Sequence, residues 1–64
     1  MKAANFREID IRECRLGDRI ADLCGHELTG KERRPDGRTN LIVADEQGKR
    51  HGAVWWTQTI RVLI

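Results

Sequence analysis

The chain has 64 residues, a formal net charge of +2 and only two cysteines. A chain of this length forms one domain with a marginal core, and two cysteines exclude the disulfide framework of a secreted miniprotein. The opening MKAANFREIDIREC carries acidic residues and is not a signal peptide, and no apolar run approaches the roughly 20 residues of a membrane helix. We therefore expect a single domain over residues 1–64, located in the cytoplasm and not bound to a membrane.

The first half of the chain predicts short strands rather than helices. No window keeps apolar residues at helical spacing for three turns. Residues 1–8 are assigned to an arm that is either flexible or packed on the domain. A first strand is predicted at 9–11 and a second at 19–23. A turn at Gly25-His26 then leads into a return strand over 28–34.

The second half contains the strongest turn signal, Pro35-Asp36-Gly37. Proline presets φ, and Asp-Gly tolerates the left-handed backbone of tight hairpins. A strand is predicted at 39–45, a turn at 46–48, and a further strand at 49–56. The polar residues 57–59 suit one turn of 3-10 helix before a last strand at 60–64.

The spacing of these turns indicates the fold. Short strands separated by turn signals about every 8 to 12 residues are typical of a small sandwich or barrel. The chain is too short for a seven-stranded sandwich. We therefore predict an all-β protein, a small five-stranded SH3-like barrel with one 3-10 turn before the last strand.

One segment adds a family resemblance. IRECRLGDRIADLCGHELTG is followed by a turn, an apolar strand, a glycine turn and the closing TIRVL. This arrangement, over residues 9–64, resembles small uncharacterised SH3-like barrel proteins of actinobacterial phages, although their usual Asp-Gly turn is Cys24-Gly25 here. The resemblance implies an SH3-like fold and a phage origin, hence the host cytoplasm, but no activity.

Two adjacent tryptophans raise the question of which one is buried. Neighbouring side chains of a strand point to opposite faces, so Trp55 and Trp56 cannot both enter one core. We predict a core made of Val54, Trp56, Ile60, Val62, Ile20, Leu28 and Val43. Trp55 and Leu63 then lie outside. They either cover one another, pack beneath the N-terminal segment against Phe6, or form an exposed apolar patch.

An exposed patch favours a protein-interaction module without enzymatic activity. Tryptophan and arginine are enriched at binding hot spots, and exposed apolar patches mark interfaces. The predicted contact residues are Trp55, Leu63 and Arg61, with Arg50 and His51 on the rim. The apolar last strand, which ends without a charged gatekeeper, is also expected to pair edge to edge. The predicted partner is a host protein or a second copy of the chain.

Nucleic-acid binding is the alternative. Six basic residues lie on or beside two predicted hairpins: Lys31, Arg33, Arg34, Arg38, Lys49 and Arg50. They would contact phosphates while an exposed tryptophan stacks on a base. Four acidic residues are interleaved with them, which weakens this prediction.

Metal binding and catalysis are not predicted. Four residues carry candidate zinc ligands, namely Cys14, Cys24, His26 and His51, but no closely spaced cysteine pair forms a zinc knuckle. The chain has no serine, no phosphate-cradling loop and no obvious pair of catalytic carboxylates. We therefore expect no metal, no cofactor and no enzymatic activity.

Overall fold

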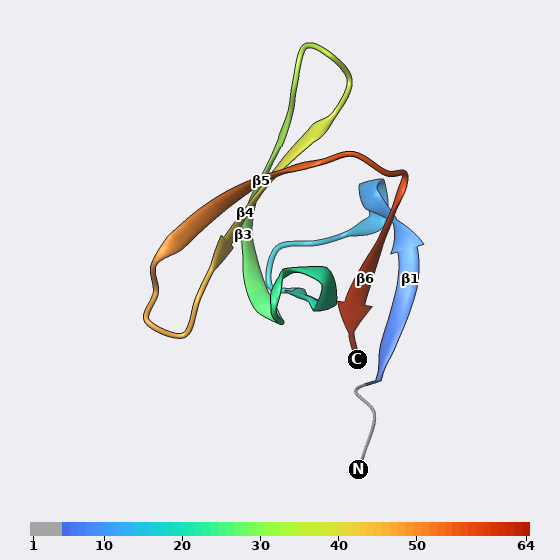
Figure 1. Cartoon of the computed structure of the whole chain (residues 1–64). Coiled ribbons are helices and arrows are strands. Elements are labelled where there is room, and N and C mark those ends of the chain that lie inside the picture. Colours follow the sequence, from blue (N-terminus) through green and yellow to red (C-terminus); the bar gives the residue numbers. More distant parts are fainter. Residues whose placement is uncertain (1–4) are drawn as a thin grey trace.

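The computed structural model describes residues 5–64, which form one curled antiparallel sheet (Figure 1). Its six strands are β1 (Phe6–Asp10), β2 (Arg19–Ile20), β3 (His26–Arg33), β4 (Thr39–Ala44), β5 (Arg50–Trp55) and β6 (Thr59–Leu63). Their order in the sheet is β1-β6-β2-β3-β4-β5, so the described strands form a half-barrel with β1 and β5 at its two edges. The predicted all-β class is confirmed. The sheet has six strands rather than the five predicted, and the shortest, β2, contributes only two residues.

Two 3-10 turns make sharp bends in the first half of the chain. These are η1 (Ile11–Glu13) and η2 (Ala21–Leu23). Asp10 caps the first turn by accepting a hydrogen bond from the Arg12 backbone N–H at 2.8 Å. The strand predicted over 19–23 therefore ends at Ile20, where η2 begins. The 3-10 turn predicted over 57–59 is wrong, because the chain only bends there before β6 begins.

β6 lies inside the sheet, between β1 and β2. It pairs with β1 on one side, where Ile9 faces Ile60, and with β2 on the other, where Ile20 faces Val62. The prediction that the last strand is an exposed edge is therefore wrong. Residues 6–8 of the predicted arm belong to β1, and residues 1–4 lie outside the described part.

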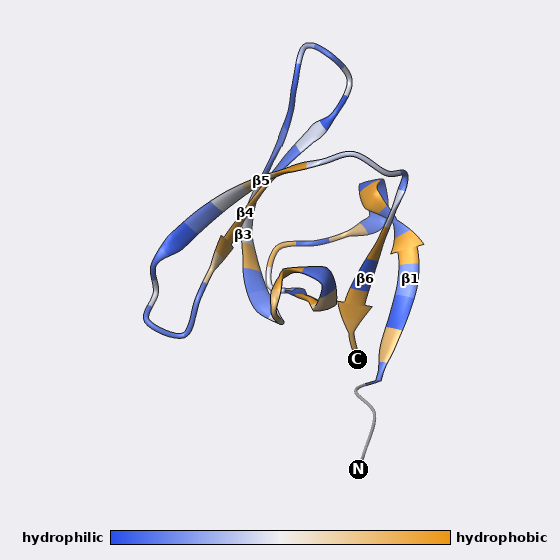
Figure 2. Ribbon diagram, viewed as in Figure 1, coloured by the Kyte–Doolittle hydropathy of each residue, from blue (hydrophilic) through white to orange (hydrophobic). Residues whose placement is uncertain are grey.

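The core lies in the concave side of this curled sheet. Its buried members are Ile11, Cys14, Ile20, Leu28, Leu41, Val43, Ile60 and Val62. Burying an aliphatic side chain of this size stabilises the fold by about 1.5 to 3 kcal/mol. Five of the seven predicted core residues are confirmed, and Val54 and Trp56 are not among them. Figure 2 shows the hydrophobic colours gathered around the centre, while the tips of the two long hairpins are hydrophilic.

Two well-defined turns fix the register of the β3–β4–β5 ribbon. At the Pro35–Gly37 turn, the Asp36 carboxylate accepts a hydrogen bond from the Arg38 N–H at 3.0 Å. At the next turn, Asp45 accepts hydrogen bonds from the backbone N–H groups of Gln47 and Lys49, each at 2.9 Å. Such Asx contacts stabilise tight turns. Within residues 5–64, no helix has the length and apolar character needed to cross a bilayer.

Candidate interaction surface

The register of β4 and β5 decides how the two tryptophans are placed. Leu41 faces Ala53 and Thr39 faces Trp55, and directly paired residues share a face of the sheet. Because Leu41 is completely buried, Trp55 points to the core side. Trp56 follows the last residue of β5 and is 68% exposed. The predicted assignment of the two tryptophans is therefore wrong by one residue. Strand side chains alternate between the two faces, so a register error of one residue exchanges the positions of the two tryptophans.

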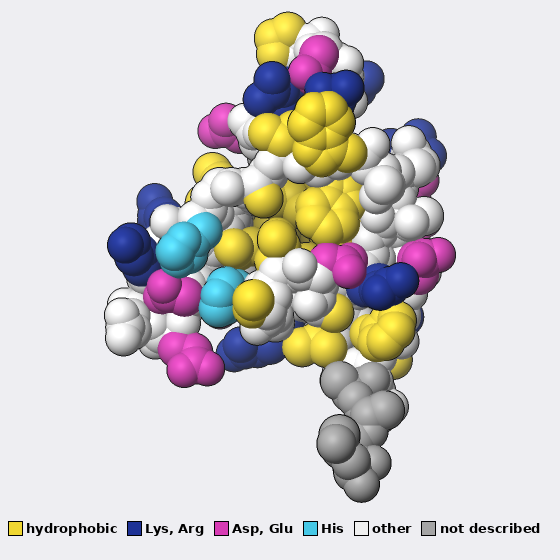
Figure 3. Space-filling view, viewed as in Figure 1, with side chains coloured by type: hydrophobic (Ala, Val, Ile, Leu, Met, Phe, Trp, Pro, Cys, Tyr) yellow, Lys and Arg dark blue, Asp and Glu magenta, His cyan; other side chains and the backbone are white. Residues whose placement is uncertain are grey.

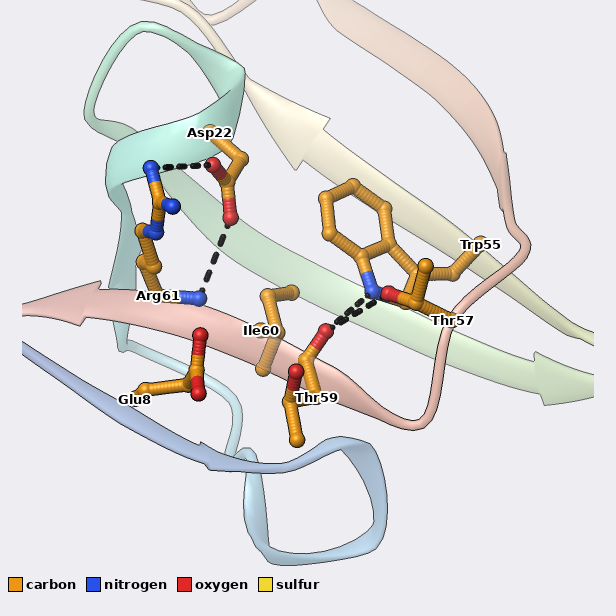
Figure 4. Close-up of a pocket in the computed structure, with 7 residues that line it drawn as sticks. All are labelled: Glu8, Asp22, Trp55, Thr57, Thr59, Ile60 and Arg61. Atoms are coloured by element: carbon orange, nitrogen blue, oxygen red, sulfur yellow. Dashed lines mark hydrogen bonds and ion pairs between the residues drawn. The ribbon is translucent and has the colours of Figure 1, made fainter.

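Trp55 ties the end of β5 to the start of β6. It packs against the core and its Nε1–H donates a hydrogen bond to the Thr59 carbonyl oxygen at 2.9 Å. The Thr57 hydroxyl donates to the same oxygen, also at 2.9 Å (Figure 4). Trp55 therefore has a structural role at this bend, and it is not the exposed hot spot that the sequence suggested.

Trp56 is held from one side by an arginine of the neighbouring hairpin. The guanidinium carbon of Arg38 lies 3.6 Å from the centroid of the Trp56 ring. This is the geometry of a cation–π contact. Arg38 also lies 3.9 Å from the Asp36 carboxylate, and Arg34 lies 3.2 Å from it. The Arg38 N–H bond to Asp36, together with both guanidinium groups, lowers the pKa of that carboxyl. The hairpin thus orients Arg38 before any partner binds.

Two further apolar side chains lie on the convex face of β4 and β5. Ile42 and Val54 are half-buried and alternate with the core-facing residues of their strands. Gly30 lies across from Ile42, and a Cβ there would lie 3.2 Å from Ile42 Cδ1, so Ile42 leans over the space that glycine leaves. We call Trp56 and Arg38, which contact one another, the Trp56 surface.

Only some of the predicted protein-binding residues are brought together. Trp55 and Arg61 line the same shallow pocket of about 370 Å³, together with Glu8, Asp22, Thr57, Thr59 and Ile60 (Figure 4). Arg61 is engaged there: its backbone N–H donates to Asp22 at 3.1 Å and its guanidinium lies 3.8 Å from the same carboxylate. Arg61 and Asp22 are therefore already bonded to each other within this pocket.

The remaining predicted contact residues lie elsewhere. Leu63 is half-buried and faces Phe6 across the β1–β6 pair, which confirms that these two residues are neighbours. Arg50 and His51 lie at the opposite end of β5 from Trp55. His51 Nε2 is 2.9 Å from Asp45, and this hydrogen bond is the main cause of the lowered pKa of the Asp45 carboxyl. The predicted five-residue site is therefore not one surface.

The predicted nucleic-acid residues separate into two groups. Arg33 faces Thr39 at one end of the β3–β4–β5 ribbon, whereas Arg50 faces Ala44 at the other. The length of β4 between them is about 17 Å. At the first end, Arg34 and Arg38 surround Asp36, while Lys31 donates to the Cys14 carbonyl. At the second end, the Lys49 backbone is bound to Asp45. The expected juxtaposition of the two basic hairpins is wrong.

The candidate metal ligands also do not converge. Cys14 is buried, and removal from water, followed by the nearby Asp18 carboxylate, raises the pKa of its thiol. Cys24 is exposed, in the left-handed turn before β3. The rings of His26 and His51 are stacked with centroids 6.1 Å apart, and Figure 3 shows the two histidines side by side. In residues 5–64, no three histidine, cysteine or acidic side chains are grouped to hold a metal ion.

Comparison with protein-family models, curated proteins and solved structures found no match to this chain. The candidate surface therefore rests on geometry. Two features were missed at the sequence level, the Arg38–Trp56 contact and the free edge of β5. One signal for the register was present in the sequence. Counted outward from the turn at 46–48, Trp55 falls on the same face as Val43, which is a core residue.

Proposed function

We propose that this chain is a small, non-enzymatic protein-interaction module that contacts its partner through the Trp56 surface. The observation that carries the proposal is the 68% exposure of Trp56 while Arg38 holds one side of its ring. Tryptophan and arginine are the residues most often found at binding hot spots. Because the ring is already oriented, binding loses less side-chain entropy than it would for a free tryptophan.

The fold family, origin and partner of the chain are also part of this proposal. We propose that the curled six-stranded sheet is a variant of the SH3-like barrel, and that the chain is a phage accessory protein of the host cytoplasm. Its partner would be a host protein or a second copy of itself. Cys14 is a poor candidate nucleophile, because burial and a raised thiol pKa disfavour the reactive thiolate.

The test compares Trp56→Ala with Leu16→Ala. Leu16 is 64% exposed and lies in the turn before β2, so its loss removes a similar apolar side chain from another part of the surface. We expect Trp56→Ala to abolish both partner capture from cell lysate and self-association by light scattering, and Leu16→Ala to change neither. Binding that survives Trp56→Ala, or that both variants weaken equally, would overturn the proposal.

The nucleic-acid alternative stays a prediction. It would depend on Arg33, Arg38 and the exposed Trp56 ring at one end of the ribbon. Phosphate contacts make affinity fall steeply with salt. A shift assay at low salt with single-stranded DNA and RNA tests it, and the absence of a shifted band removes it.

A further inference from the structure

The two edges of the sheet differ in charge. Among the described strands, β1 and β5 each have one side without a strand partner. β1 carries three charges in five residues, Arg7, Glu8 and Asp10. β5 carries Arg50 and His51 at its start and then the uncharged run 52–55. Charged residues protect an edge against pairing, so β5 is the edge that remains available to another strand.

The hydrogen-bond pattern identifies which backbone groups of β5 are free. The Asp45 N–H donates to the Lys49 carbonyl at 2.9 Å, which makes this facing pair a hydrogen-bonded one. Hydrogen-bonded and non-bonded pairs alternate along an antiparallel ladder. His51 and Ala53 therefore direct their N–H and C=O groups to β4. Gly52 and Val54 direct theirs away from the sheet, toward the free edge.

We propose that a second copy of this chain pairs antiparallel along β5, with the two-fold axis passing at Ala53. This inference rests on the proposed function, because it names the partner as another copy. In this register Gly52 of each copy exchanges backbone hydrogen bonds with Val54 of the other. The two sheets then become one continuous sheet, and the interface closes on itself instead of extending into a fibre.

The small residues at the centre permit this approach. The two Ala53 residues would face each other as a non-bonded pair, in which Cα atoms come within about 4.5 Å. Methyl groups fit this spacing. A Cβ added to Gly52 would meet no atom within 4 Å beyond its two chain neighbours, so no side chain of the described residues crowds this position on the face of the sheet.

The side chains select this register over its neighbours. With Ala53 on the axis, Arg50 faces Trp56 of the second copy, and His51 faces its Trp55. Arg50 can then form a cation–π contact with the Trp56 ring, which is still 68% exposed after Arg38 has stacked on it. With Gly52 on the axis, Arg50 faces Val54 instead. With Val54 on the axis, Arg50 has no partner in the other copy's strand.

The pairing is tested by comparing Gly52→Pro with Gly52→Ala in sedimentation equilibrium over a concentration series. Proline removes an N–H that points away from β4, whereas alanine keeps it and enters open space. We expect the parent chain and Gly52→Ala to form dimers, and Gly52→Pro to raise the dimer dissociation constant at least about tenfold. Amide exchange gives an independent readout: the Gly52 and Val54 amides should slow as concentration rises.

A second pair of variants keeps the test decisive if the proline variant unfolds. Arg50→Glu is expected to weaken the dimer several-fold, while the matched charge change Arg33→Glu, at the other end of the ribbon, leaves it unchanged. A monomer at every concentration refutes the pairing, as does a dimer that neither Gly52→Pro nor Arg50→Glu weakens. Assemblies that grow without limit also refute it.

Failure of the pairing and failure of the proposed function give different results. A monomer that still captures a lysate protein through Trp56 keeps the function and removes the β5 pairing. A dimer that depends on Trp56 but not on Gly52 does the same. A chain that neither self-associates nor captures a protein removes both.

Discussion

The opposite placement of the two tryptophans predicts a large difference between two chemically identical substitutions, Trp55→Phe and Trp56→Phe. Trp55→Phe removes the Nε1–H bond to the Thr59 carbonyl, a loss of about 1 kcal/mol. It also removes roughly 40 Å² of aromatic surface from contact with the core, about 1 kcal/mol more. The Thr59 oxygen keeps its bond from Thr57, so no buried acceptor is left without a partner.

The same change at Trp56 affects much less packed surface. Because that ring is 68% exposed, only about a third of the lost area counts, or about 0.3 kcal/mol. Arg38 can still stack on a phenyl ring, so the cation–π contact weakens by only a few tenths of a kcal/mol. A domain of this size loses about 4 to 8 °C of Tm per kcal/mol. We therefore expect Tm to fall by about 8 to 16 °C in Trp55→Phe and by no more than about 5 °C in Trp56→Phe.

Thermal unfolding followed by circular dichroism in dilute samples measures both variants. Each also retains one tryptophan, so fluorescence reports the environment of the other ring. The tryptophan left in Trp56→Phe should emit at shorter wavelength and resist acrylamide quenching. If Trp56→Phe lowers Tm as much as Trp55→Phe, or if acrylamide quenches both rings equally, the placement of the tryptophans is wrong.

Three further predictions follow from the core, the carboxyl groups and the thiols. Leu28→Ala should destabilise the fold by about 2 to 5 kcal/mol, a large part of its stability, and denaturant titration will show a much lower midpoint of unfolding at 25 °C. Hydrogen bonds hold the pKa of the Asp10 and Asp45 carboxyls below the ordinary value, so their stabilisation is present above about pH 4 and is lost as pH falls further. Tm should therefore decline on acidification below about pH 4, less steeply in Asp10→Asn, and an unchanged slope would contradict this reasoning. A thiol reagent should modify the exposed Cys24 much faster than the buried Cys14, whose pKa is raised; equal rates would contradict the burial of Cys14.

Much of the fold could be predicted because local chemistry determines it. The turns at Pro35–Gly37 and at 46–48 are encoded by residues that favour left-handed or preset backbone angles, and both are found where predicted. Ile20, Leu28 and Val43 were assigned to the core from their places in predicted strands. The partner of each strand could not be predicted in this way, because the pairing of β6 with both β1 and β2 depends on how the whole sheet curls.

The error at Trp55 and Trp56 has a specific cause. The sequence analysis places Val54 and Trp56 on one face of their strand and assigns that face to the core. It is in fact set by pairing with β4, where Leu41 faces Ala53. The contact between Arg38 and Trp56 depends on the same register and on the rotamer of a long side chain. The turn at 46–48 bears on the register, but sequence spacing alone does not contain the rotamer of Arg38.

The internal position of β6 has a consequence for how the protein is made. On a ribosome, β1 emerges early and must wait for a strand synthesised about fifty residues later, because Phe6 pairs with Leu63 and Asp10 pairs with Thr59. Until then Ile9 and Ile20 lack the partner strand that shields them. Contacts between residues so far apart in sequence also slow folding. We expect the nascent chain to expose these apolar side chains until β6 has left the exit tunnel, and to become compact only then.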